Sequence, residues 1–237
     1  MVTPPVAEID WPESHRIIRS IYPPVFLFED IADPADWDLI ASAEAKTNPR
    51  VRDEIGDLTL VPVDRRISGA GASIVMGAFT HCSVDRKSRF SDGTYGIWYA
   101  GDCLEVALAE TIYHHERFMR RTNEAPADSQ FRELKAHIGG KLRDLRKPGS
   151  EKYLTPDDYA ASQAIAREFR TASEDGIVYP SVRWSKGQAV ALFWPDRVRT
   201  PIIQARHLLY HWDGARVDRY FVYGEDKWYA PPSMPVL

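Results

Sequence analysis

Seven short segments of the chain carry the β-branched, aromatic or alternating residues that are typical of β-strands. They are residues 16–21, 95–100, 131–141, 177–184, 188–194, 202–212 and 215–223. Pro23 and Pro24 close the first segment, and Asp213-Gly214, which is typical of a tight hairpin, separates the last two. The pattern therefore predicts a sheet that is mostly antiparallel.

Three further segments, residues 33–47, 102–120 and 155–173, carry the start signals of helices. Asp33 can cap the first helix, and Asn48-Pro49 marks its end. Asp102 can cap the second helix, and Thr155 can cap the third, where a proline and two acidic residues follow. The inward stripe of the second helix is predicted to be Leu104, Ala107, Leu108, Thr111, Ile112 and His115.

Residues 50–94 lack clear periodicity and are rich in glycine, serine and aspartate. A segment of this length without periodicity usually carries function or wraps the core, and residues 58–63 are its candidate strand. Residues 1–14 contain three prolines and are predicted to form an N-terminal tail. The elements together predict a single α+β domain over residues 15–237, with about three helices.

The composition is that of an ordinary globular protein of 237 residues, with 44% hydrophobic and 27% charged residues. The net charge of −4 gives no reason to expect nucleic acid or an anionic membrane as a direct partner. The first residues lack the basic and apolar regions of a signal peptide, so we expect a cytoplasmic protein. Cys82 and Cys103 are accordingly expected to be reduced thiols.

Motifs for metal binding and for nucleophilic catalysis are weak. His207 and His211 would share a strand face, and residues 114–116 (His-His-Glu) cluster on a helix, but neither group has the spacing of a zinc site. We therefore expect no metal. Cys103 starts a helix, which leaves a thiol hydrolase open as an alternative, whereas the G-x-S-x-G string of a serine hydrolase does not occur.

The most informative stretch is SRFSDGTYGIWYAGDCLEVALAE, which leads from a turn through an aromatic strand into a helix. Tyr99 ends the strand, and Glu110 follows eleven residues later on a partly apolar flank of the helix. Glu105 and Glu116 are predicted to share a more solvated face. Taken alone, Glu110 is better explained as a residue of the helix surface paired with Arg117.

Five motifs in order along the chain resemble those of the RES-domain family, toxins of bacterial toxin–antitoxin modules that attack NAD. The motifs are His15-Arg16-Ile17, Ser88-Arg89-Phe90-Ser91-Asp92-Gly93, Trp98-Tyr99-Ala100, Ala107-Leu108-Ala109-Glu110 and Gly176-Ile177-Val178-Tyr179-Pro180-Ser181. The family is named for arginine, glutamate and serine, which Arg16, Glu110 and Ser181 match in order. Ser88 and Ser91 depart from the glycine and asparagine that are usual in the turn.

The resemblance implies a fold similar to ADP-ribosyltransferases, a split antiparallel β core with NAD as the substrate and no metal. It implies that Glu110, Arg16 and Tyr99 are catalytic. It also implies that Arg16, Arg89, Tyr99 and Ser181 bind NAD. In this interpretation Glu110 stabilises positive charge on the ribose, and the arginines hold anionic oxygens.

The acceptor of the ADP-ribose stays open in the sequence between water, phosphate and a side chain of a host protein. The resemblance also implies a cognate antitoxin with a helix-turn-helix (Xre-like) domain, which blocks the NAD cleft and provides any contact with DNA. Two alternatives lie outside NAD chemistry. One is a non-enzymatic interaction module that uses residues 50–94, and the other is a cysteine-dependent hydrolase that uses Cys103.

Overall fold

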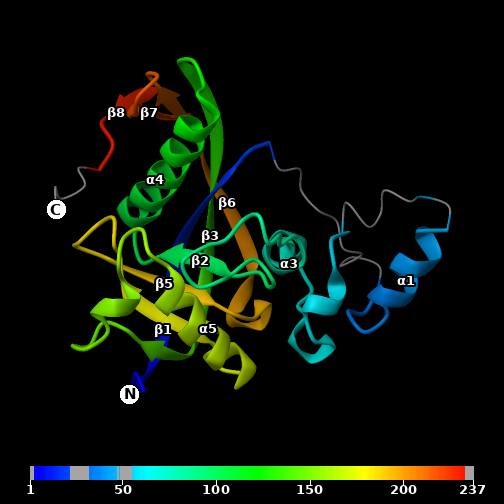
Figure 1. Cartoon of the computed structure of the whole chain (residues 1–237). Coiled ribbons are helices and arrows are strands. Elements are labelled where there is room, and N and C mark those ends of the chain that lie inside the picture. The colour runs from blue at the N-terminus through cyan, green and yellow to red at the C-terminus, as the bar shows by residue number, and fades with distance from the viewer. Residues whose placement is uncertain (1–2, 22–31, 47, 49–54, 233–237) are drawn as a thin grey trace.

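The computed structural model describes residues 3–21, 32–46, 48 and 55–232 (Figure 1). The strands are β1 (Val6–Arg19), β2 (Trp98–Gly101), β3 (Ala127–Asp144), β4 (Gly176–Pro180), β5 (Gln188–Leu192), β6 (Val198–Trp212), β7 (Val217–Val222) and β8 (Lys227–Tyr229). The α-helices in these residues are α1 (Trp37–Glu44), α3 (Ala72–Thr80), α4 (Leu104–Thr122) and α5 (Ala160–Thr171). The α+β class is confirmed, with four described helices where about three were predicted.

All eight strands belong to one sheet, in the order β1-β2-β5-β4-β3-β6-β7-β8. A further pairing of β1 with β3 closes the first five strands into a ring, and β6, β7 and β8 extend from β3. Every pairing is antiparallel except that of β3 with β4, so the predicted antiparallel character is confirmed. The pairing of β1 with β2 is short and joins His15 to Gly101.

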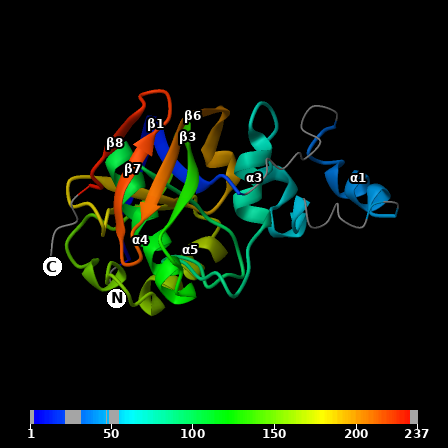
Figure 2. The same cartoon turned by 90° about the horizontal axis from the view of Figure 1, so that it is seen from above.

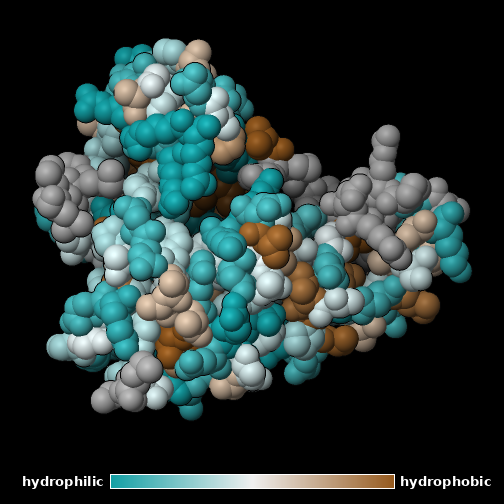
Figure 3. Space-filling model, in the orientation of Figure 1, coloured by the Kyte–Doolittle hydropathy of each residue, from teal (hydrophilic) through white to brown (hydrophobic). Residues whose placement is uncertain are grey.

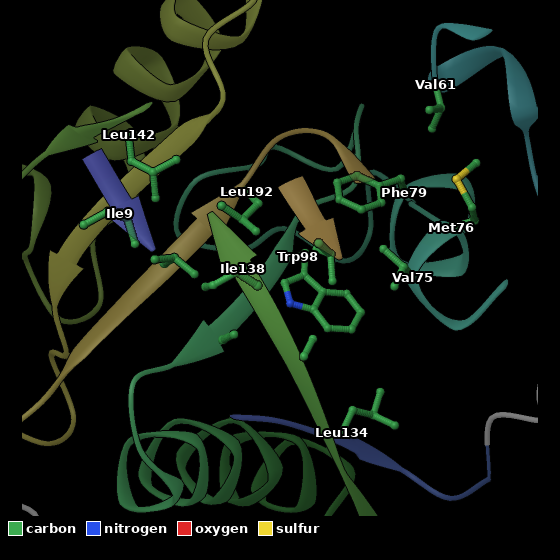
Figure 4. Close-up of a cluster of buried hydrophobic side chains, with 14 of the residues drawn as sticks. Ile9, Val61, Val75, Met76, Phe79, Trp98, Leu134, Ile138, Leu142 and Leu192 are labelled. Carbon is green, nitrogen blue, oxygen red and sulfur yellow. The ribbon is translucent and has the colours of Figure 1, made fainter. Parts of the chain in front are cut away.

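One hydrophobic cluster fills the inner face of this ring. Alternate side chains of a strand point to the same face, so Leu134, Ile138 and Leu142 of β3 meet Trp98 of β2 and Leu192 of β5 (Figure 4). Helix α3 adds Val75, Met76 and Phe79. Burying each such side chain contributes about 1.5–3 kcal/mol, which makes this cluster a main source of stability.

Two other clusters fix the helices that carry the candidate site. On the other face of β4 and β5, Phe169 of α5 packs with Ile177 and Phe193. Helix α4 packs against β3 and β6 through a stripe that includes Leu108 and Ile112. The predicted inward stripe of this helix is confirmed at its buried positions, which are Ala107, Leu108, Ile112 and His115. The site therefore rests on elements that are anchored by packing.

The N-terminal residues are more ordered than predicted. Residues 6–14 belong to β1, which pairs with β3 from Val6 to Arg19, and they do not form a tail. The prolines did not prevent this, because Pro4 and Pro5 precede the strand and Pro12 lies at an irregularity in its register. The predicted closure of this strand at Pro23 and Pro24 lies outside the described residues.

The segment of residues 50–94 contains a helix that the sequence pattern did not predict. Most of the surface of α3 is buried, and its sequence ASIVMGAFT is correspondingly apolar on nearly every side. Such a helix has no alternation of apolar and polar faces, which is the signal that predicts a helix from sequence. The predicted strand at residues 58–63 is wrong. Leu58–Leu60 form one turn of 3₁₀ helix, in which the Asp57 carboxylate accepts a hydrogen bond from the Thr59 amide.

The three predicted helices exist, but each begins later than its start signal. Helix α1 begins at Trp37, since the Asp33 carboxylate instead closes a local turn with the Ala35 amide. In α4 the cap position is held by Cys103 and not by Asp102. Helix α5 begins at Ala160, so that residues 155–158 form a loop. The predicted end of the first helix at Thr47 and Pro49 lies outside the described residues.

Figures 1 and 2 both show α3 beside the sheet and α1 beyond α3. The face in Figure 3 is mainly hydrophilic, and its hydrophobic residues gather mostly around α3. Large exposed apolar side chains between residues 32 and 94 include Leu39, Val63 and Val84. Exposed apolar residues of this kind are common on soluble proteins, and they do not by themselves mark a binding surface.

Candidate active site

Glu110 and Ser181 meet between helix α4 and the end of strand β4. The Ser181 hydroxyl donates to Oε1 of Glu110 at 2.9 Å. The hydroxyl oxygen of Ser181 also accepts hydrogen bonds from the backbone amides of Arg183 at 3.3 Å and Trp184 at 3.1 Å. These two amides occupy the acceptor side of the hydroxyl, so its proton is directed to the carboxylate. The predicted partnership of Glu110 with Arg117 is not found; Ser181 takes that place.

Burial raises the pKa of Glu110 above its usual value of 4.5. Ser181 and the positive charges of Arg89 and Arg183 act in the opposite direction, since they favour the ionised form. The Glu110 carboxylate has therefore lost many of the contacts with water that an exposed carboxylate makes. It therefore interacts strongly with a positive charge that develops beside it.

Arg89 lies in the turn before β2, and the residue is 7% exposed. Nη1 donates to the carbonyl of Thr155 at 2.7 Å, and Nη2 donates to that of Pro156 at 3.2 Å. The guanidinium group also lies 4.8 Å from the ring centre of Tyr159. Its hydrogen bonds are thus made to neutral oxygens of one loop.

The turn that carries Arg89 is fixed by the two serines that depart from the family pattern. The Ser91 hydroxyl donates to the carbonyl of Tyr95 at 2.5 Å and accepts from the amide of Gly93 at 3.0 Å. Gly93 has φ of 93°, and a Cβ there would lie 2.2 Å from a backbone oxygen of Ser83, so the position requires glycine. Ser91 therefore contributes contacts within the turn, and Ser88 contributes one as well, because its hydroxyl shares a hydrogen bond with the Tyr99 hydroxyl.

Tyr99 fastens the same turn from β2. Its hydroxyl accepts from the amide of Phe90 at 3.0 Å and shares a hydrogen bond of 2.9 Å with the Ser88 hydroxyl. Burial raises the pKa of Tyr99, so the phenol is neutral at physiological pH. The geometry gives Tyr99 a positioning role toward Arg89, and its predicted contact with NAD stays a prediction.

Arg16 lies apart from this group, next to the position where β1 pairs with β2. Its Nη1 donates to the carbonyl of Tyr99 at 3.0 Å, and its guanidinium group lies 4.5 Å from the ring centre of Trp98. Neighbouring side chains of β2 point to opposite faces, so Arg16 lies on the face opposite to the Tyr99 ring. Burial lowers the pKa of Arg16 to about 10, which leaves it charged at neutral pH. None of its described contacts reaches Glu110, and its role in binding stays a prediction.

Sequence reasoning missed three residues beside Glu110, namely Arg183, Tyr113 and Tyr179. The guanidinium group of Arg183 lies 3.4 Å from the ring centre of Tyr113, and its Nη2 donates to the carbonyl of Pro156 at 2.7 Å. Tyr179 is buried, and its pKa is raised by burial and by the charge of Glu110. The available signal was spacing, because Tyr179 and Arg183 each lie two residues from Ser181.

The alternatives based on other chemistry find no support in the described residues. Burial raises the pKa of Cys103 to about 11, which is the opposite of what a thiolate nucleophile needs. The described part of the chain holds no group of three potential metal ligands. His211 is bonded to Asp128 and His207 to Gln204. No helix among the described residues has the length and apolar character that crossing a membrane requires.

One expectation about the surroundings of Glu110 is corrected. Glu116 does not lie on a solvated face. It is 7% exposed, and its carboxylate accepts from the Val217 amide at 2.8 Å and from Arg120 at 2.7 Å. A cavity of 270 Å³ next to Glu116 is lined mainly by α4, β7 and Pro231-Pro232, and none of its lining residues belongs to the candidate site.

Comparison with known proteins shows similarity to a family model, to a curated protein and to a solved structure. The RES domain family model matches residues 64–213, a span that contains Arg89, Tyr99, Glu110 and Ser181 but not Arg16. The uncharacterized protein y4oC of Sinorhizobium fredii is 26% identical over 218 residues, which cover 90% of this chain and 88% of that protein. The M. tuberculosis MbcT–MbcA toxin–antitoxin complex matches with a TM-score of 0.42 and 11% identity, over 84% of this chain and 86% of the other. Since the family model covers more than half of its length, the chain belongs to the RES-domain family.

Proposed function

We propose that the protein is the toxin of a type II toxin–antitoxin system that cleaves the nicotinamide–ribose bond of NAD and transfers the ADP-ribose to an acceptor. The observation that carries the proposal is the partly buried Glu110 carboxylate, to which Ser181 donates a hydrogen bond and which lies near the charges of Arg89 and Arg183. Membership of the RES-domain family and the resemblance of its motifs to NAD-targeting toxins support it.

The chemistry of this bond calls for a carboxylate. When the ribose C1′–nitrogen bond breaks, its electron pair neutralises the nicotinamide ring, and positive charge develops on the ribose. An ionised Glu110 beside the ribose stabilises that charge where it forms. The acceptor oxygen or nitrogen then bonds to C1′ and gives up a proton, which Glu110 is able to accept because burial has raised its pKa.

The remaining residues bind and position the substrate in this proposal. Arg89 supplies positive charge for the diphosphate of NAD, and Tyr99 holds the turn that carries Arg89. Ser181 sets the orientation of the Glu110 carboxylate. Arg16 serves as a further cation for the substrate, next to the position where β1 pairs with β2.

The acceptor in this proposal is water, phosphate or a side chain of a host protein in the cytoplasm. An antitoxin with an Xre-like helix-turn-helix domain covers the NAD site and makes any contact with DNA. The competing interaction module would use residues 50–94 as a free surface. Of that segment, Ile55, Val61 and Phe79 are buried in the main core, which favours a structural role for its described part.

Expression of the chain without a partner in bacterial cells tests the proposal, with Glu110→Gln as the matched control. We expect the wild type to slow growth and either to lower cellular NAD or to modify a host protein with ADP-ribose. The variant should do neither at equal soluble expression. Normal growth, unchanged NAD and no modified protein in cells with abundant soluble wild type would contradict the proposal.

A further inference from the structure

Two buried arginines beside Glu110 make their described hydrogen bonds to the same loop. Arg89 donates to the carbonyls of Thr155 and Pro156, and Arg183 donates to that of Pro156 and, at 3.4 Å, to the Asp157 carboxylate. We propose that Arg183 and Arg89 together form a binding site for a diphosphate group, and that residues 155–157 cover this site until the ligand displaces them. The inference rests on the proposed function, because NAD is a ligand with such a group.

The charges around the two arginines leave an excess of positive charge, which suits an anionic group. Arg89 and Arg183 are only 7% and 8% exposed as whole residues, so water screens their charges little. The facing acids are Asp157, which is exposed, and Glu110, whose ionisation burial opposes. Arg117 adds further positive charge near Asp157. Guanidinium groups form stronger hydrogen bonds with anionic oxygens than with the neutral carbonyls that they contact here.

Arg183 also carries a donor with no described use. Its Nε is buried and has no hydrogen-bond partner, which is rare for a buried polar atom. Nε and Nη2 lie along the same edge of the guanidinium group, where two parallel N–H groups can grip two oxygens of one phosphate. At present Nη2 bonds to the carbonyl of Pro156, and Nε is left unfilled. A phosphate group would satisfy both donors.

The contacts described for residues 155–157 explain how the loop can yield to a ligand. The loop is held by the two arginines and by the Tyr113 hydroxyl, which donates to Asp157. Tyr113 also stacks on Arg183 and fixes the plane of its guanidinium group. A ligand that takes over the arginine donors therefore removes most of the described contacts of the loop while leaving the arginine oriented.

Titration calorimetry of the whole protein with inorganic pyrophosphate tests this site. We expect Arg183→Gln to weaken pyrophosphate binding by about 10-fold or more, since a hydrogen-bonded charge is lost. Asp157→Asn removes the acid that competes for Arg183, and it should strengthen binding several-fold. A residue with a purely structural role would not produce opposite changes in these two variants. Arg216→Gln removes the same charge from an exposed position in the β6–β7 turn, and it should leave binding unchanged.

Wild-type affinity in Arg183→Gln, or weaker binding in Asp157→Asn, would overturn the inference. If Arg183→Gln does not fold, Arg183→Lys keeps the charge without the paired donors, and it should still weaken binding; unchanged affinity in that variant would equally overturn it. The two proposals fail separately. Pyrophosphate binding that depends on Arg183 without NAD cleavage supports the site and refutes the proposed function. NAD cleavage together with pyrophosphate binding that does not depend on Arg183 supports the proposed function and refutes the diphosphate site.

Discussion

Ser181→Ala tests whether the Ser181 hydroxyl controls the protonation of Glu110. The change removes the 2.9 Å hydrogen bond to the carboxylate and the acceptor used by the amides of Arg183 and Trp184. It leaves the carbon skeleton and the strand before it unaltered. The carboxylate keeps its surroundings and the charges of the nearby arginines, so among the groups that act directly on the pKa of Glu110 the change removes the Ser181 hydroxyl.

The expected size follows from the charge of the acceptor. A hydrogen bond to a charged group contributes about 1.5–3 kcal/mol, which corresponds to about 1–2 pKa units. The Ser181 hydroxyl lowers the pKa of Glu110, so its removal raises that pKa further. The ionised fraction then falls at a given pH, and the acid limb of the rate profile should move to higher pH by about 1 unit or more.

The assay is the rate of NAD cleavage between about pH 4 and pH 8, with the free energy of unfolding measured on the same samples. Two buried amides lose their acceptor, so we expect stability to fall by about 1–3 kcal/mol. Ser14→Ala is the control, because Ser14 is also buried and donates to the carbonyl of Ala136. It should lose stability without a shift of the acid limb. An unshifted acid limb in folded Ser181→Ala would refute the reasoning.

Three further changes test other parts of the account. Glu110→Gln should lower the rate of NAD cleavage by about 10²–10³-fold with little change in stability, whereas Glu105→Gln, on the exposed side of α4, should match the wild type in both assays. Glu116→Gln should lower the free energy of unfolding by about 1–3 kcal/mol in a denaturant titration, because the buried carboxylate accepts from Val217 and Arg120; an unchanged midpoint would contradict this. Burial raises the pKa of Glu133, but hydrogen bonds from His15 and Arg206 outweigh it and hold the pKa below 4.5. This contribution to stability is therefore present above pH 4.5 and is lost as the pH falls through the lowered folded value, so acid unfolding should be less steep in Glu133→Gln than in the wild type.

Local sequence patterns predicted the elements that have one face packed on the protein and one face in solvent. The stripe of α4 is an example, since Leu108 and Ile112 recur at helical spacing and face β3 and β6. Helix α3 was missed because its surroundings bury nearly every side, which removes the period. The start of α5 was misplaced for a tertiary reason, since Arg89 and Arg183 hold residues 155–157 as a loop.

The candidate site was predictable where it depends on motif order and not where it depends on contacts across the fold. Glu110 and Ser181 were named from the resemblance, and the structure brings them to hydrogen-bond distance. Arg183 carried no motif of its own; its role follows from Tyr113 and Pro156, which lie 70 and 27 positions away. The burial of Glu116 depends on Val217, about one hundred residues later, and no spacing on the helix reveals such a partner.

Release of nicotinamide from NAD by the purified protein tests the central claim most directly. Wild type and Glu110→Gln are incubated with NAD, with and without phosphate and cell lysate, and the nicotinamide and ADP-ribose products are identified. We expect the wild type to release one nicotinamide per NAD consumed, and a folded Glu110→Gln variant to release it at least about 100-fold more slowly. No release by the wild type under any of these conditions, or equal release by the variant, would contradict it.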